Sequence, residues 1–214
     1  MSSGRNLLSQ CRKPTGWFGR FTLWTMNIRH SKVTDWGLAR VSIAKNATIL
    51  DVGCGGGRTI QKLAAIATAG KVYGVDYSEA SVAAAERTNA RTINAGRVEI
   101  RESSVSHLPF PDNTLDLVTG VETHFFWPDL PNDMREVLRV LKPGGKLILI
   151  SEIYQGGKHD RRVQMLERYA EITRMTILSV DGDRELFSKA GYSDVEVIDD
   201  YAKGWICAMG KKPT

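Results

Sequence analysis

The sequence lacks the features of a membrane-spanning, secreted or metal-binding chain. Its longest apolar runs, such as residues 147–150, have the length of a buried strand and fall far short of the roughly 20 residues that cross a bilayer. Residues 1–10 are polar and no apolar signal segment follows them. The three cysteines, Cys11, Cys54 and Cys207, lack metal-ligand spacing and are odd in number. We therefore expect free thiols, no bound metal and a reducing compartment, by default the cytoplasm.

Internal repeats, low-complexity tracts and an extreme charge are also absent. With 214 residues, 42% hydrophobic and 25% charged, the composition is that of an ordinary globular chain long enough for one substantial core. The net charge of +5 is unevenly distributed, because residues 1–45 hold eight lysines or arginines against Asp35 alone. That segment is +7 and leaves −2 for the rest. It also contains five of the large aromatic residues: Trp17, Phe18, Phe21, Trp24 and Trp36.

The basic, aromatic segment has two interpretations. It could present a surface to an anionic partner, either nucleic acid or lipid headgroups. Alternatively, it could be an amphipathic cap whose aromatic side chains pack on the domain while its charges face solvent. Nucleic-acid modules usually show a more extreme basicity than this, so we favour the cap. We accordingly divide the chain into an N-terminal segment, 1–45, and a main domain, 46–214.

Strand-like and helix-like stretches alternate through the main domain. Short apolar runs bounded by turn residues predict five strands, at 47–52, 71–75, 98–101, 115–118 and 146–150. Apolar residues at helical spacing predict helices at 59–69, 80–90, 131–141, 162–175 and 183–190. Ser78 is the expected N-cap of the second helix. Strands separated by helices or connections of helix length indicate an α/β fold with a doubly wound, mainly parallel sheet.

The end of the chain departs from this alternation. Two strands are predicted at 195–198 and 205–209, and only six residues separate them. A connection this short cannot hold a crossover helix, so the two strands must form an antiparallel hairpin. An antiparallel final strand distinguishes the sheet from that of a dehydrogenase.

A glycine-rich turn follows the first predicted strand, where Gly53 and Gly55 to Gly57 lead into a helix. Glycine there allows a ligand to approach the backbone closely. Such a turn is shared by NAD, FAD and S-adenosylmethionine (SAM) sites. The dinucleotide pattern G-x-G-x-x-G would need glycine at position 58, where this chain has Arg58. Asp51 ends the strand, and its carboxylate would repel a pyrophosphate but suits the ammonium and sulfonium of SAM.

A second carboxylate follows on the next strand. Asp76 ends the strand at 71–75, and in doubly wound sheets an acid at this place accepts hydrogen bonds from both ribose hydroxyls. Tyr77 could lay its ring along an adenine. Taken alone, Asp76 could instead cap the following helix. Together, Asp51 and Asp76 mark the carboxyl ends of adjacent strands, where such folds bind ligands.

Four segments together resemble the class I SAM-dependent methyltransferases, in particular the ubiquinone-biosynthesis-like, type 11 group. They are LDVGCGGG at 50–57, VYGVDYS at 72–78, LPFPDNTLDLV at 108–118 and EVLRVLKPGGKLIL at 136–149. The segments span about half of the chain. The resemblance implies a Rossmann-like sheet of seven strands, mainly parallel, with an antiparallel last strand and helices on both faces. It also implies SAM as the cofactor.

The resemblance implies roles for particular residues. Gly53, Cys54 and Gly55 would lie against the methionine portion of SAM, with Asp51 beside them, and Asp76 would hold the ribose. The loop after the third strand usually carries an acid for the adenine amino group. Here Ser104 occupies that position, a departure that bears on cofactor affinity, and the Val105 amide could contact the ring. Thr119 and Gly120, at the end of the fourth strand, would face the transferring methyl group.

The loop after the fourth strand lies where a methyl acceptor should approach. Methyl transfer needs a general base only if the acceptor must lose a proton, and Glu122 and His124 are the candidates nearest Thr119. Glu122 could instead contact the cofactor or tether the N-terminal segment, and His124 could be an ordinary packed residue. Tyr154, just past the fifth strand, is a further pocket candidate. Residues 152–180 and the N-terminal segment are expected to form a lid over the site.

We expect a methyltransferase that acts on a small molecule. One alternative is an RNA methyltransferase that uses the basic segment, although Phe126–Asp129 does not match the Asn-Pro-Pro-Tyr motif and no RNA-binding module is present. A second alternative is a SAM-binding sensor without catalysis, which no feature of the sequence excludes. An NAD oxidoreductase is disfavoured by Asp51 and Arg58. The sequence does not indicate an oligomeric state.

Overall fold

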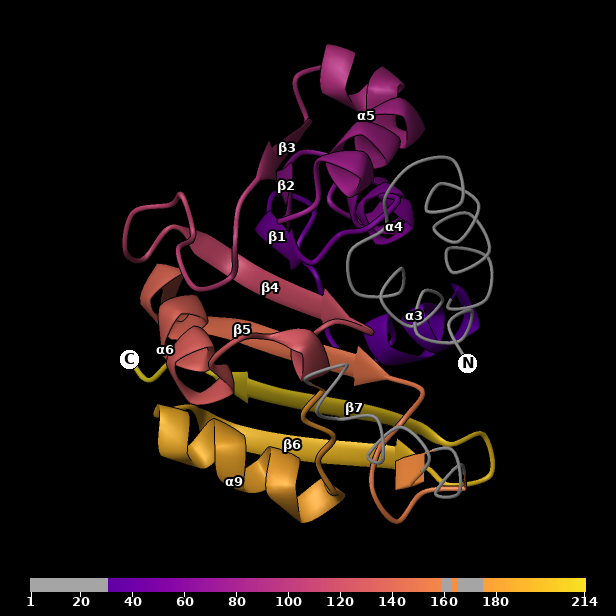
Figure 1. The fold of residues 1–214 in the computed structure, drawn as a ribbon. Helices are drawn as coiled ribbons and strands as arrows, with labels where there is room; N and C mark the ends of the chain where they lie inside the picture. The colour runs from indigo at the N-terminus through magenta and orange to yellow at the C-terminus, as the bar shows by residue number, and fades with distance from the viewer. Residues whose placement is uncertain (1–30, 159–162, 165–174) are drawn as a thin grey trace.

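A computed structural model describes residues 31–158, 163–164 and 175–214 (Figure 1). Within these ranges the chain forms one seven-stranded sheet in the order β3-β2-β1-β4-β5-β7-β6. The strands are β1 (Thr48–Val52), β2 (Lys71–Asp76), β3 (Val98–Glu102), β4 (Leu115–Val121), β5 (Leu141–Ser151), β6 (Ser193–Asp200) and β7 (Trp205–Lys211). Five predicted strands and the hairpin are therefore confirmed.

Strand direction also follows the prediction. β1 pairs in parallel with β2 and β4, β2 with β3, and β4 with β5. β7 is antiparallel to both β5 and β6, so β6 runs in the same direction as the first five strands. The chain order reverses between β1 and β4, which places the carboxyl ends of β1, β2 and β4 at one edge of the sheet. This is the position at which open α/β sheets bind ligands.

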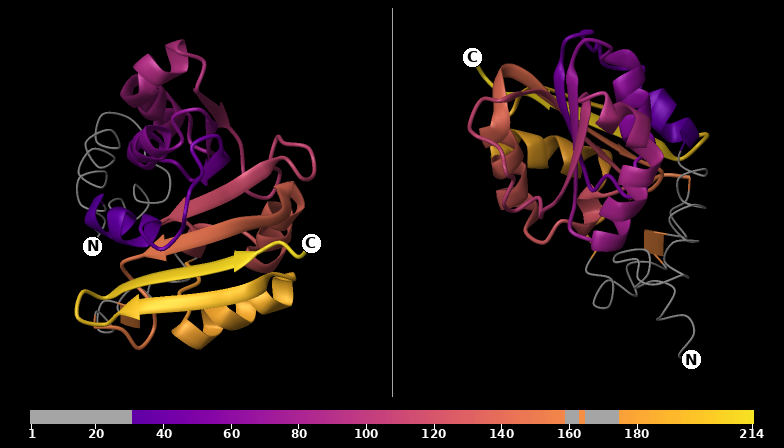
Figure 2. Two further views of the ribbon diagram at one scale, coloured as in Figure 1. Left: turned by 180° about the vertical axis from the view of Figure 1, so that it is seen from behind. Right: turned by 90° about the horizontal axis from the view of Figure 1, so that it is seen from above.

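Helices cover both faces of the sheet (Figure 2). One face carries α3 (Ser31–Leu38), α4 (Arg58–Ile66) and α5 (Glu79–Asn94), and the other carries α6 (Leu130–Val140) and α9 (Val180–Ala190). A short 3-10 helix, η1 (His124–Phe126), follows β4. The prediction did not include α3 or η1. Most of the helix predicted at 162–175 lies outside the described residues, as do Trp17 to Trp24 and Cys11.

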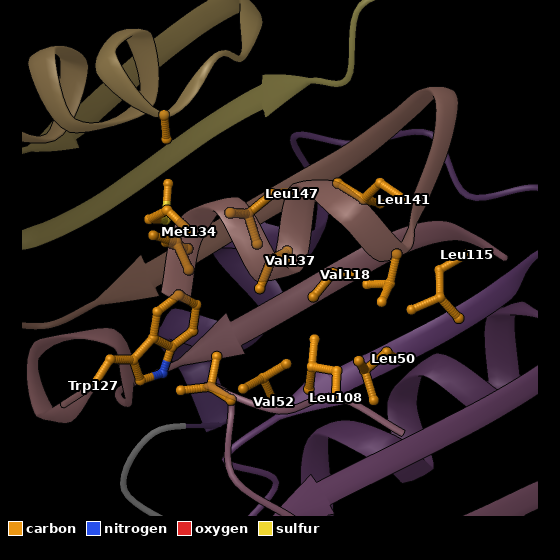
Figure 3. Close-up of a cluster of buried hydrophobic side chains, with 14 of the residues drawn as sticks. Leu50, Val52, Leu108, Leu115, Val118, Trp127, Met134, Val137, Leu141 and Leu147 are labelled. Atoms are coloured by element: carbon orange, nitrogen blue, oxygen red, sulfur yellow. The ribbon is translucent and has the colours of Figure 1, made fainter. Parts of the chain in front are cut away.

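The core consists of two main clusters, one on each face, because successive side chains of a strand point to opposite sides. On β5, Leu147 and Leu149 belong to the cluster beneath α6 and α9, whereas Ile148 and Ile150 belong to the cluster beneath α3 and α4. In Figure 3, side chains such as Met134 of α6 lie against those of the strands. This packing on both faces fixes the strand ends that carry the site.

Two further observations bear on predictions from the sequence. Trp36, on α3, packs against Trp205 with ring centroids 5.8 Å apart, and the Arg40 guanidinium lies over the Trp36 ring, 4.8 Å from its centroid. The interpretation of residues 1–45 as a cap stays a prediction. Cys54 and Cys207 are buried free thiols, as expected. No helix in the described part of the chain is long and apolar enough to span a membrane.

Candidate active site

The glycine-rich turn links β1 to α4 and has a backbone that only glycine adopts readily. Gly53 and Gly57 have φ of +69° and +78°, in the left-handed region. A Cβ on Gly53 would lie 2.1 Å from Thr123 Oγ1, and one on Gly57 would lie 2.5 Å from Asn89 Nδ2. The amides of Gly53 and Cys54 both donate to the Val75 carbonyl, at 2.8 and 3.0 Å. The turn is therefore held against β2, the loop after β4 and α5, with no room for a side chain at Gly53 or Gly57.

Asp76 connects this turn to the end of β2. Its Oδ2 accepts a hydrogen bond from the Gly55 amide at 2.9 Å, and its Oδ1 accepts one from the Ser78 amide at 2.9 Å. Burial raises the pKa of Asp76, while these hydrogen bonds and one from the Ser81 side chain lower it. Ser78 is the N-cap of α5 as predicted, but its side chain makes no capping bond. A carboxylate has about four acceptor positions, so Asp76 can still accept bonds from a ligand.

Asp51 lies at the end of β1 and is only 2% exposed. Its Oδ1 accepts a hydrogen bond from Thr119 Oγ1 at 2.6 Å across the β1–β4 pair. Burial, with a smaller effect of the neighbouring Asp76 charge, raises the pKa of Asp51 to about 7 despite the lowering effect of the Thr119 hydrogen bond. Among the described residues, no cationic side chain forms an ion pair with either acid. Two buried carboxylates without a counter-ion fit a ligand that brings positive charge.

The predicted adenine-side residues come from the chain just after β2 and just after β3, and they differ in exposure. Tyr77 is 40% exposed, whereas Val105 is buried. The Ser104 hydroxyl accepts a hydrogen bond from the Ser106 amide at 3.2 Å, which orders the loop after β3. Cys54 is buried within the glycine turn, and burial raises its thiol pKa well above the ordinary value, so this thiol is a packing group rather than a nucleophile.

The end of β4 brings together the remaining predicted residues. Thr119 is fully buried, and a Cβ on Gly120 would lie 2.9 Å from Leu149 Cδ2. Glu122 has φ of +55°, unusual for a residue with a side chain. Its carboxylate accepts a hydrogen bond from the Glu152 amide. Glu122 thus ties the end of β4 to the chain just after β5.

His124 begins η1 and is 5% exposed. Burial lowers its pKa to about 4, so the imidazole is neutral at physiological pH. Tyr154 lies elsewhere: its hydroxyl donates to Asp199 Oδ2 of β6 at 2.8 Å. Burial and this contact raise the pKa of the Tyr154 phenol. Tyr154 is therefore engaged with the β6 edge of the sheet.

The sequence analysis did not identify three residues of the site. Asn89 of α5 donates from Nδ2 to the Gly57 carbonyl at 3.0 Å, and Thr123 packs against Gly53. Asp183, in the first turn of α9, lies 3.9 Å from His124. A polar residue within the apolar face of α5 was the available sign for Asn89. No local pattern marks Thr123, and Asp183 resembles an ordinary acid at a helix start.

Comparison with known proteins places these features in a family. Residues 50–149 match the family model described as "Methyltransferase domain". The chain is 32% identical to O-methyltransferase cnsE of Penicillium expansum, over 75% of this chain and 57% of the relative. It is 37% identical to demethylmenaquinone methyltransferase of Lactiplantibacillus plantarum, over 53% of this chain and 48% of the relative. The chain thus spans about half the length of these curated relatives.

A solved structure shares the fold. A SAM-dependent methyltransferase from Aquifex aeolicus superimposes with a TM-score of 0.72 at 20% identity, covering 90% of this chain and 98% of that one. The matched family model indicates a methyltransferase domain. The strand order and the glycine turn with its two acids are consistent with that family. Residues 50–149 are therefore a methyltransferase domain of the type 11 group, in a chain that has the fold of the class I SAM-dependent methyltransferases.

Proposed function

We propose that the chain transfers the methyl group of SAM to a small-molecule acceptor. The observation that carries this proposal is the pair of buried acids, Asp51 and Asp76, which have no cationic partner among the described residues. Apart from its terminal carboxylate, SAM is a cation, with an ammonium and a sulfonium, so it offsets the cost of keeping two carboxylates buried. A pyrophosphate would increase that cost.

Different residues at the carboxyl edge of the sheet bind different parts of SAM. Asp76 accepts bonds from the ribose hydroxyls with the acceptor positions that Gly55 and Ser78 leave open. Asp51, held by Thr119, faces the cationic methionine portion. Gly53, Cys54 and Gly55 let the backbone approach it. Ser104, Val105 and Tyr77 contact the adenine, and Thr119 and Gly120 lie nearest the methyl group.

The chemistry makes few demands on the protein. SAM supplies an electrophilic methyl group and a neutral thioether leaving group. The side chains of this chain need to align the acceptor and exclude water, which can contribute most of the acceleration. Among the two candidate bases, Glu122 is engaged with the Glu152 amide, so we assign it the tethering role. His124 is neutral, and its Nδ1 has no hydrogen-bond partner among the described residues, so we assign it the role of base.

A methyl-transfer screen tests this function. The full chain is incubated with SAM labelled in the methyl group and with panels of hydroxyl, amine, thiol and acidic-carbon compounds, and with an RNA pool. We expect label in one small-molecule class and none in RNA, and the Asp76→Ala variant serves as a negative control. Label in RNA, with binding that weakens steeply as salt rises, would instead support the RNA methyltransferase. SAM binding without transfer to any panel would support a sensor.

The compartment belongs to the same proposal. Cys54 and Cys207 are unpaired and buried, as is usual for proteins kept under reducing conditions. We therefore place the enzyme in the cytoplasm, and fractionation of cells that express the tagged chain tests this placement.

A further inference from the structure

Two buried polar side chains face each other beside the site, and the roles assigned above leave one of them unused. His124 lies at the start of η1 and Asp183 in the first turn of α9, and they are 5% and 2% exposed. His124 Nε2 and Asp183 Oδ1 are 3.9 Å apart. In the described part of the chain, His124 Nδ1 and Asp183 Oδ1 have no hydrogen-bond partner.

The topology explains why these distant residues meet. β6 runs parallel to β5, because β7 is antiparallel to both. α9 leads into β6 from the opposite direction, so its N-terminus lies at the carboxyl edge of the sheet (Figure 1). The Thr176 amide, just before α9, donates to the Phe125 carbonyl of η1 at 2.8 Å. The pair is therefore built into the edge that carries Thr119 and Glu122.

Buried polar atoms without a partner are costly. Each costs about 1–3 kcal/mol, and such groups are usually retained where a ligand or a reaction uses them. Burial lowers the pKa of His124 to about 4 and raises that of Asp183 to about 7. The imidazole is therefore neutral at pH 7. Within the described ranges, Asp183 is the only acidic side chain that forms an ion-pair contact with it.

We propose that Asp183 is a positioning residue that accepts the Nε2–H of His124, so that Nδ1 is left as the proton acceptor for a hydroxyl substrate. This inference rests on the proposed function. The separation of 3.9 Å exceeds a hydrogen bond, and catalytic hydrogen bonds are often long before the substrate binds. Because Nδ1 is buried, acceptor binding must also displace the side chains that cover it.

The surroundings of the pair indicate the class of acceptor. The Phe125 ring lies 5.4 Å from the imidazole, and Phe126 lies 4.8 Å from Phe125. Phe125 belongs to an apolar cluster with Ile153 and Ile177. Apolar aromatic and aliphatic side chains such as these favour contact with a flat apolar skeleton and disfavour a charged one. A buried, weakly basic imidazole also suits an acidic hydroxyl better than an aliphatic alcohol. The acceptor is therefore a phenol or an enol.

The step balances as follows. The acceptor oxygen forms a bond to the methyl carbon while the carbon–sulfur bond breaks and its electron pair stays on sulfur. The hydroxyl proton passes to Nδ1, and Asp183 faces the resulting imidazolium. The products are the methyl ether, the neutral thioether S-adenosylhomocysteine (SAH) and a protonated His124, which later releases its proton to water.

A nitrogen NMR experiment tests the pair without an acceptor. The full chain, labelled at histidine and saturated with SAH, is compared with Asp183→Asn, and the His124 signal is assigned from its loss in His124→Gln. We expect the Nε2–H tautomer in the wild type at pH 8, where Asp183, with a pKa of about 7, is ionised and can only accept. In Asp183→Asn the amide can donate to Nε2, so we expect the Nδ1–H tautomer, as an aspartate-to-asparagine change produces in other histidine–carboxylate pairs.

The matched control is Asp133→Asn. Asp133 is also a buried acid in the first turn of a helix, α6, but it accepts from Ser106 Oγ at 2.6 Å rather than facing His124. This variant should keep the wild-type tautomer. An Nδ1–H tautomer in the wild type, or the same tautomer in wild type and Asp183→Asn, would overturn the positioning role.

A second experiment tests the acceptor class with one skeleton and three nucleophiles. Labelled methyl transfer is measured to 2-naphthol, 2-naphthylamine and 2-naphthalenethiol. We expect transfer to 2-naphthol alone, with kcat at least about 100-fold lower in Asp183→Asn and an unchanged affinity for SAH. Transfer only to the amine or thiol, or to none of the three, would refute the acceptor class. Failure of the wild type to bind SAM at all would instead refute the proposed function.

Discussion

Replacing Asp51 by asparagine should stabilise the ligand-free chain, by an amount that depends on pH. Asparagine keeps an oxygen for the Thr119 hydroxyl, which now donates to Asp51 Oδ1 at 2.6 Å, and removes the buried charge. The unfolded chain ionises Asp51 near pH 3.8, whereas the folded chain does so at about pH 7. Between these values the folded state binds more protons, so the wild-type stability falls as the pH rises.

The size of the effect follows from these two values. For a pKa that moves from 3.8 to about 7, raising the pH from 5 to 8 removes about 2.5 kcal/mol of unfolding free energy. Asp51→Asn lacks this contribution. Its stability relative to the wild type should therefore increase by about 2.5 kcal/mol between pH 5 and pH 8. Titrating groups that do not interact with Asp51 are common to both proteins and cancel in the difference.

Equilibrium unfolding in urea, followed by tryptophan fluorescence at both pH values, measures this difference. Asp116→Asn is the control: burial raises the pKa of Asp116, but hydrogen bonds from Lys142 and Thr48 lower it below its usual range. The Asp116→Asn substitution should therefore change the free energy of unfolding by the same amount at pH 5 and pH 8. Saturating SAM should stabilise the wild type far more than Asp51→Asn at pH 8. A difference between Asp51→Asn and wild type that does not change with pH would refute the reasoning.

Three further changes have defined outcomes. Gly53→Ala places a Cβ 2.1 Å from Thr123 Oγ1 at a φ of +69°; it should cost at least about 1–3 kcal/mol in thermal unfolding and weaken SAM binding, and an unchanged Tm would contradict the close packing. Phe187→Ala removes a fully buried ring and should lower the free energy of unfolding in urea by about 3–5 kcal/mol. A decrease of less than about 1 kcal/mol would contradict this packing. Thr119→Val removes a hydrogen bond that lowers the Asp51 pKa. The pH at which SAM affinity is half-maximal should therefore move upward, and a downward shift would contradict the role of Thr119.

Much of the fold could be predicted because local signals agree with it. The apolar run before Gly53 is β1, and the short connection, 201–204 in the structure, forces β6 and β7 to be antiparallel. Boundaries were less accurate. β4 extends to Val121 and β5 begins at Leu141, since pairing with neighbours extends a strand beyond its apolar run. α3 was missed because Val33 and Leu38 are buried by the tertiary packing, which a short window does not reveal.

Some residues of the candidate site could be predicted from the sequence and others could not. Asp51, Asp76 and the glycines follow one another at strand ends, so chain order alone indicates that they converge. Asp183 is 59 residues beyond His124 in sequence, and only the return of α9 to the carboxyl edge brings them within 3.9 Å. The contact between Glu122 and the Glu152 amide likewise depends on the β4–β5 pairing. Such long-range contacts have no periodicity or spacing that a single sequence can show.

Calorimetric titration with SAM tests the placement of the cofactor most directly. Asp76→Ala removes the carboxylate proposed to hold both ribose hydroxyls, and hydrogen bonds to a charged group contribute about 1.5–3 kcal/mol each. Asp112→Ala, at an exposed acid that pairs with Arg139, is the control. We predict an affinity at least about 100-fold weaker for Asp76→Ala and an unchanged affinity for Asp112→Ala. Equal affinity of the wild type and a folded Asp76→Ala variant would contradict the proposed site.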